Sequence, residues 1–226
     1  MKLSIIIIAS MPTKGMRSVG NVSLLPVNKK QSILEKHINN IQSVFNGAEI
    51  VVVGGFESKK MQKLLYKYKN VKYIYHEVKN YSNETKSFYE GLKACKNNKC
   101  IVFNANCIAN KSFWSKIKYR TKKSIAVINS SKSFHSEIGA TTKNNEINYI
   151  FYGLPCKITN VYLLQKEHTD YFLQEYIEPW GSKYLFEIIN ILCKKRKMYY
   201  QDIVNNIFII NSMKDYNKIT KKEAYV

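Results

Sequence analysis

The chain has 226 residues, with 36 Lys and Arg against 16 Asp and Glu and a formal net charge of +20. Hydrophobic residues make up 45% of it and aromatic residues 13%, a globular composition that excludes a chain disordered over most of its length. The length fits one domain, residues 1–226, with a well-buried core.

The positive charge favours polyanionic partners, nucleic acid among them. However, the lysines are scattered, and no helix-turn-helix, RNA-recognition or zinc-finger pattern occurs. An AT-rich genome would encode the same excess of Lys, Asn, Ile and Tyr at unconstrained surface positions. Both explanations of the charge stay open.

Hydropathy and cysteine usage favour a cytoplasmic protein without a membrane span. The longest apolar run, residues 3–9, is too short for a bilayer span or a usual signal peptide. The five cysteines are odd in number and lack the paired Cys-x-x-Cys spacing of a zinc site, which predicts reduced thiols.

Strand and helix patterns alternate along the first half. The clearest helix opens with the capping-box pair Ser32 and Glu35 and ends at Gly47. Buried strands are predicted at residues 3–9, 48–55, 71–76 and 100–104. Further helices are predicted through Met61, Leu64 and Leu65, near 85–95 and around 113–119. This alternation predicts a doubly wound α/β fold.

The second half predicts antiparallel or mixed strands appended to the parallel sheet. Short apolar segments separated by polar turns occur at residues 124–129, 137–142, 146–152 and 157–164. Helical patterns follow at 166–175 and 183–193, then a strand at 206–211 and a last short helix.

Ligands of open α/β sheets bind outside the carboxyl ends of the strands. Four loops are therefore predicted to form the site, at residues 10–30, 54–57, 77–83 and 104–110. The last of them, "NANCIAN", carries Asn106 where an acid would be usual.

Several segments match a known family in chain order. Gly15-Met16-Arg17 precedes "SLLPVNKKQSILEKHI", and "EIVVVGGFESKKMQKLL", "NYSNETKSFYEGLKAC" and "IFIINSMKDYNKI" follow. Together they resemble the nucleotidyltransferases that activate sugars or alcohol phosphates. The resemblance implies a GT-A-like fold, a mostly parallel mixed sheet flanked by helices. It also implies a nucleoside triphosphate and a phosphorylated small molecule as partners.

The resemblance also implies roles for single residues. Arg17 would hold the triphosphate as the catalytic residue. Nucleotide contacts would come from Ser10, Met11, Gly15, Met16, Asn83 and Ser87. From the residues alone, Asn83 and Ser87 fit helix caps equally well, Asn106 fits a solvated turn or the N-cap of the helix at "KSFW", and Asp215 fits a first-turn acid.

The sequence departs from the family at the positions of its catalytic and metal-binding residues. The family's signature Lys falls near Val22, and its two metal-binding Asp residues fall at Asn106 and Asn211. Mg²⁺ usually takes one or two carboxylates, so two neutral amides predict a degenerate, weakened metal site. Two hypotheses follow: an active nucleotidyltransferase, or a non-catalytic homologue that binds nucleotide or serves a structural role, for example in a virus.

Overall fold

One strand, β1 (Ser4–Ala9), organises the fold, which a computed structural model describes for residues 2–13, 15–77, 84–119, 122–132, 137–177, 181, 183–202 and 206–221. All six of its residues are buried. It pairs in parallel with β2 (Glu49–Gly54) on one side and β4 (Cys100–Asn104) on the other, and β3 (Val71–Tyr75) continues the sheet beyond β2. Continuous apolar runs are typical of parallel strands covered on both faces.

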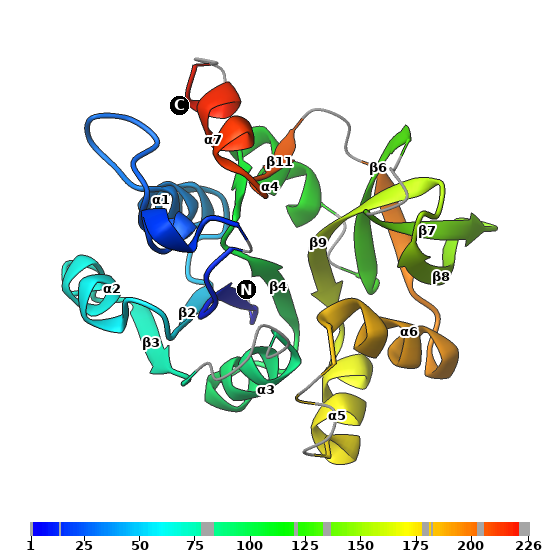
Figure 1. Cartoon of the computed structure of the whole chain (residues 1–226). Helices are drawn as coiled ribbons and strands as arrows, with labels where there is room; N and C mark the ends of the chain where they lie inside the picture. Colours follow the sequence, from blue (N-terminus) through cyan, green and yellow to red (C-terminus); the bar gives the residue numbers. More distant parts are fainter. Residues whose placement is uncertain are drawn as a thin grey trace.

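Helices cover both faces of this parallel sheet (Figure 1). Ile5 and Ile7 of β1 pack with α1 (Ile33–Val44), α2 (Ser58–Leu65) and α4 (Lys111–Lys118). Ile6 and Ile8 point the other way, into a core shared with α3 (Glu84–Ala94), α5 (Lys166–Glu175) and α6 (Leu185–Lys195). The alternation along one strand thus serves two separate cores.

Helix α1 begins at the predicted capping box. The Ser32 hydroxyl accepts the backbone N–H of Glu35 at 3.3 Å, and the Glu35 carboxylate accepts the backbone N–H of Ser32 at 2.7 Å. Helix α4 is capped by Asn110, whose side chain accepts the N–H of Phe113 at 2.9 Å. The alternative role of Asn106 as this cap is therefore wrong, because the helix begins after Asn110.

Helix α3 lies unusually close to the sheet. A Cβ on Gly91 would stand 2.7 Å from Cγ2 of Ile6 and 2.9 Å from Cγ2 of Val53. Only a glycine leaves room for the helix at this distance from β1 and β2. The close contact fixes the first turn of α3, and hence Glu84, relative to the end of β4.

The second half extends the sheet with mixed strands, as predicted. Beyond β4 the order is β9 (Cys156–Leu164), β6 (Ile125–Lys132), β10 (Tyr199–Asp202), β8 (Glu146–Tyr152) and β7 (Ile138–Lys143). β9 is antiparallel to both β4 and β6, whereas β10 is parallel to β6. Strand β10 was not predicted, because its four half-buried residues show no alternation.

A separate antiparallel pair joins distant parts of the chain. β5 (Cys107–Ala109) pairs with β11 (Ile207–Ile209), so the strand predicted at 206–211 lies outside the main sheet. Helix α7 (Met213–Thr220) follows and packs on the loop after β1, where Tyr216 Oη donates to the carbonyl oxygen of Pro26 at 2.6 Å. The C-terminal segment therefore lies against the N-terminal loop (Figure 1).

The predicted α/β class, a mixed sheet with helices on both faces, is confirmed. Among the described helices, none has both the length and the apolar character that crossing a bilayer requires.

Candidate functional site

A cavity of about 680 Å³ opens at the carboxyl ends of β1 and β4. One wall comes from the loop after β1, with Met11, Pro12 and Thr13 followed by Asn21 and Ser23. The remaining walls come from the end of β4, from β8 and β9, and from the segment around β11 and α7. Its position is the one predicted for an open α/β sheet, and its size suits a small-molecule ligand.

Asn21 holds the loop after β1 in place. Its side-chain amide donates to the carbonyl oxygens of Ala9 at 2.7 Å and Phe56 at 3.2 Å, and its backbone N–H donates to the Glu57 carboxylate at 2.6 Å. The hydrogen bond from Lys60 and the Asn21 N–H lower the pKa of Glu57. The loops after β1 and β2 therefore form one rigid wall.

The predicted nucleotide-binding residues fall into separate places. Met11 lines the cavity, while Ser10 and Ser87 lie fully buried and share a hydrogen bond of 2.7 Å between their hydroxyls. His76 Nδ1 lies 2.8 Å from the same Ser87 hydroxyl. The two serines thus brace the end of β1 against α3, away from the cavity surface.

The Gly-x-Arg motif stands apart from the cavity lining. Gly15 is exposed in the left-handed region at φ 78°, and Met16 is buried in a small core with Val22 and Ile210. Arg17 is exposed on the short 3₁₀ helix η1 (Arg17–Val19), with no ion-pair partner among the described residues. Asn83 lies outside the described residues, so its role stays a prediction.

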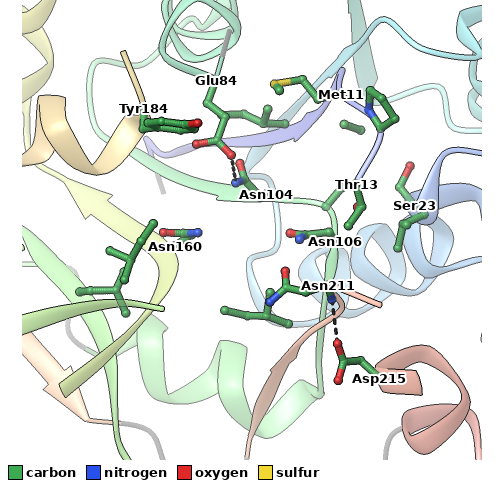
Figure 2. A pocket seen from close by; sticks show the side chains of 18 of the residues that line it. Met11, Thr13, Ser23, Glu84, Asn104, Asn106, Asn160, Tyr184, Asn211 and Asp215 are labelled. Carbon is green, nitrogen blue, oxygen red and sulfur yellow. Dashed lines mark hydrogen bonds between the residues drawn. The ribbon is translucent and has the colours of Figure 1, made fainter. Parts of the chain in front are cut away.

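Asn106 and Asn211 meet at the cavity, as the family resemblance led us to expect. The backbone N–H of Ile210 donates to the Asn106 carbonyl at 2.7 Å, and the Asn106 side-chain amide donates to the Ile210 carbonyl at 3.3 Å. Both asparagines line the cavity, and Figure 2 shows Asn211 between Asn106 and Asp215. The β5–β11 pairing is what brings them together across 104 residues of sequence from Asn106 to Ile210.

This donor set does not fit a resident Mg²⁺ ion. Asn106 and Asn211 offer neutral amides, whereas Mg²⁺ usually binds through one or two carboxylates and substrate phosphates. Asp215 is committed to the start of α7, where its Oδ2 accepts the N–H of Asn211 at 3.1 Å and the hydroxyl of Ser212 at 2.8 Å. In the described part of the chain, no three His, Cys, Asp or Glu side chains are grouped to hold a metal.

The opposite wall contains residues that sequence analysis did not identify. Glu84, in the first turn of α3, accepts the Asn104 side-chain amide at 2.7 Å, and burial raises the pKa of its carboxyl. Tyr152 and Tyr184 line the same region, and Figure 2 shows Tyr184 beside Glu84. Lys157 of β9 forms an ion pair with Glu137. The alternation of apolar and polar residues predicted β8 and β9 as strands. It does not indicate which strands they pair with, so it could not place Tyr152 and Lys157 at the cavity.

One buried pair near the cavity resembles a nucleophile with its base but lacks the required ionisation. Sγ of Cys107 lies 3.8 Å from Nε2 of His37, which is 2.7 Å from the Cys107 carbonyl oxygen. Burial raises the pKa of the Cys107 thiol to about 12 and lowers the pKa of His37 to about 4. Both groups are neutral at pH 7, so His37 has a structural role and Cys107 is inert.

Comparisons with known proteins show the fold of the chain. A CTP:phosphocholine cytidylyltransferase from Streptococcus pneumoniae superposes with a TM-score of 0.79 at 16% identity, covering 98% of this chain and 99% of that one. A nucleoside-diphosphate-sugar pyrophosphorylase from Vibrio cholerae gives a TM-score of 0.76 at 13% identity, covering 96% and 100%. A UDP-glucose pyrophosphorylase gives 0.74 at 12% identity, covering 97% of each chain.

The sequence itself matches no protein-family model and no curated protein. The fold is therefore shared with solved nucleotidyltransferases over nearly the whole chain, at identities between 12% and 16%.

We expect the buried His37 to make stability pH-dependent. An unfolded chain protonates histidine near pH 6.5, whereas folded His37 does so only near pH 4. Stability is therefore full above about pH 6.5 and falls as the pH drops towards 4, by up to about 3 kcal/mol from this residue. Urea unfolding between pH 7.5 and 4.5 should show this slope, reduced in His37→Gln. An unchanged slope would contradict the assignment, although His168, whose pKa burial also lowers, leaves a residual slope.

Restoring both carboxylates should create a magnesium site. The double variant Asn106→Asp, Asn211→Asp places two carboxylates on one edge of the cavity, and Mg²⁺ should then raise its free energy of unfolding by about 1 kcal/mol or more at several-fold excess over Kd. Without Mg²⁺ the two charges should repel and lower stability slightly. Thermal unfolding with and without Mg²⁺ measures both effects, and the single variants serve as controls. A double variant indifferent to Mg²⁺ would show that the two positions do not share a metal site.

Proposed function

We propose that the chain transfers a nucleotidyl group from a nucleoside triphosphate to a phosphorylated small molecule and releases pyrophosphate. The observation that carries this proposal is the cavity at the carboxyl ends of β1 and β4, where Asn106 and Asn211 meet. The solved structures with this fold support it in general, since their names describe a CTP:phosphocholine cytidylyltransferase and pyrophosphorylases for UDP-glucose and nucleoside-diphosphate sugars.

In the proposed reaction, a phosphate oxygen of the acceptor attacks the α-phosphorus of the triphosphate. A new phosphorus–oxygen bond forms, the bond from the α-phosphorus to the bridging oxygen breaks, and the β- and γ-phosphates leave as pyrophosphate. Enzymes accelerate such transfers mainly by positioning the reactants and by stabilising the negative charge. Little covalent chemistry is asked of the protein.

We assign the binding of a phosphate oxygen to Lys157. Among the described residues that line the cavity, Lys157 is the only Lys or Arg. Its pairing with Glu137 fixes the ammonium on the cavity wall. An ammonium held in position binds phosphate without a further ordering cost.

Mg²⁺ enters this proposal only as an ion that the triphosphate carries. When bound, it would supply positive charge beside the phosphates, with the carbonyl oxygens of Asn106 and Asn211 as its neighbours. Because the residues present do not form a resident site, the roles assigned above belong to the chain's own side chains.

A second candidate is a non-catalytic homologue that binds nucleotide. It is favoured by the amides at Asn106 and Asn211 and by the hydrogen bonds that commit Asp215 to the first turn of α7. Loss of two carboxylates weakens the binding of a dication, and the metal charge is a main source of electrostatic stabilisation in phosphoryl-type transfer. The two candidates differ in a single observable, the release of pyrophosphate.

The first test is pyrophosphate release from each of the four nucleoside triphosphates, with pooled sugar phosphates, phosphocholine and phosphoethanolamine as acceptors. We expect release above background, and a loss of about tenfold or more in Lys157→Met because a charge-assisted contact to phosphate is removed. The control is Lys63→Met, which removes the same charge from an exposed site on α2. No release with any pair of substrates would favour the non-catalytic candidate.

The second test concerns Arg17. Arg17 stands outside the cavity lining, but its exposed guanidinium belongs to the loop from which Met11, Thr13 and Asn21 line the cavity. A guanidinium can hold phosphate oxygens in pairs. Titration calorimetry of ATP or CTP should show binding about tenfold weaker in Arg17→Ala, and a smaller change when Mg²⁺ is omitted. Arg196→Ala removes the same charge from the end of α6 and should leave binding unchanged. Binding unaffected by Arg17→Ala would contradict the assignment.

A further inference from the structure

The charged lining of the cavity is acidic, although the chain carries a net charge of +20. Its described charged members are the carboxylates Glu84, Glu137 and Asp215 and the ammonium of Lys157. Glu137 is paired with Lys157, and Asp215, in the first turn of α7, accepts hydrogen bonds from Asn211 and Ser212. Glu84 lies in the first turn of α3, where the helix N-terminus favours its negative charge, but it has no ion-pair partner among the described residues.

Glu84 has hydrogen-bond donors but no cation. Its Oε1 accepts the Asn104 amide at 2.7 Å, and the backbone N–H of Leu185 also donates to the carboxylate. Within the described residues, no Lys or Arg pairs with it. A half-buried carboxylate without a counter-ion is unfavourable, so a bound cation would be strongly attracted. Beside it, the buried Oδ1 of Asn104 has no hydrogen-bond donor in the part of the chain that the structure describes.

Two tyrosine rings stand next to this carboxylate. Tyr184 stacks on Phe186 with ring centroids 5.9 Å apart, and Tyr152 meets the edge of the same Phe186 ring at 5.6 Å. Phe186 is buried, whereas Tyr184 and Tyr152 are 42% and 41% exposed and line the cavity. A cation is attracted to the face of an aromatic ring, most strongly where water is excluded.

We propose that the acceptor is a small phosphate ester whose alcohol carries an ammonium group, bound by Glu84 and the rings of Tyr152 and Tyr184. Its phosphate would face Lys157, so the two charges of one ligand would meet opposite charges on the cavity walls. This inference rests on the proposed function, since it names the acceptor of that reaction. The phosphate ester of an uncharged sugar offers only hydroxyl donors to Glu84. The negative charge of the Glu84 carboxylate then stays unpaired.

The experiment compares phosphate esters whose alcohol carries an ammonium group with esters of the same shape whose alcohol is uncharged. The full chain, with and without a non-hydrolysable triphosphate, is titrated calorimetrically with phosphoethanolamine and with propyl phosphate, then with phosphocholine and with 3,3-dimethylbutyl phosphate. Glucose 1-phosphate is a fifth ligand. We expect the better ammonium ester to bind about tenfold or more tightly than its neutral counterpart. Comparison of the two ammonium esters shows whether N–H donors or methyl groups are preferred.

Variants separate the charge from the fold. Glu84→Gln keeps the shape and should abolish the preference for the ammonium ester, and Tyr184→Leu should reduce it several-fold. Glu90→Gln removes the same charge from the same helix, where Glu90 pairs with Lys93, and should keep the preference. Thermal unfolding of each variant confirms that it is folded.

Three results would overturn the inference. The first is equal binding of the ammonium esters and their uncharged-alcohol counterparts, and the second is tighter binding of glucose 1-phosphate than of the ammonium esters. The third is no binding of either ammonium ester under any condition. Its failure can be told apart from failure of the proposed function. Pyrophosphate release with a sugar phosphate alone would keep the function and refute the ammonium site. An ammonium preference that depends on Glu84, without pyrophosphate release from any triphosphate, would keep the site and refute the transfer reaction.

Discussion

The two-sided pairing and burial of β1 is the constraint on which the rest of the structure depends. The strand is hydrogen-bonded to β2 and β4 along both edges and covered by helices on both faces. At its carboxyl end the chain must leave the sheet, and the carbonyl groups there need new donors. Asn21 supplies one to Ala9, and the backbone N–H of Ala105 supplies one to Ile8 at 2.8 Å. The floor of the cavity consists of these contacts, so the site follows from how β1 ends.

Local patterns in the sequence were sufficient for the first half of the fold. The capping box at Ser32 and Glu35 placed α1, and the apolar runs placed β1, β2, β3 and β4. They were insufficient for β5, whose three residues are too few to show a period, and for β10. The order β9-β6-β10-β8-β7 depends on pairings between distant segments, which periodicity does not encode.

The candidate site divides in the same way. Asn106 follows a strong parallel strand, so the rule that ligands bind at strand ends located it, and the family resemblance located Asn211. Tyr184 and Lys157 come from segments whose neighbours depend on the sheet order of the second half, and no local signal marks them. Glu84 starts a helix that the sequence predicts, but the helical pattern carries no signal that its side chain lines the cavity. Ser10 and Ser87 were predicted to contact nucleotide and do lie at the predicted edge of the sheet. However, their hydroxyls are hydrogen-bonded to each other beneath the cavity surface.

Charge acts on two length scales in this molecule. The net charge of +20 attracts phosphorylated anions from a distance, and salt weakens that attraction over about a Debye length, roughly 8 Å at physiological ionic strength. Inside the cavity, fixed carboxylates and one ammonium act at contact distance, where they discriminate between ligands that the outer field attracts equally. The overall charge thus affects the rate of encounter, and the cavity lining affects the choice of ligand.

The pairing of β5 with β11 has a consequence for the order in which the molecule is made. Chains emerge from the ribosome N-terminus first, at about 5 to 20 residues per second, and early segments fold as they appear. The parallel half, through β4, can assemble when the wall formed by Ile209, Asn211 and Asp215 has not yet been synthesised. During that interval of several seconds the edge of β5 and the apolar surface of Met16, Val22 and Ile108 lack the cover that β11 and α7 later provide. A nascent chain of this protein therefore exposes this apolar surface until its last strand and helix have been synthesised.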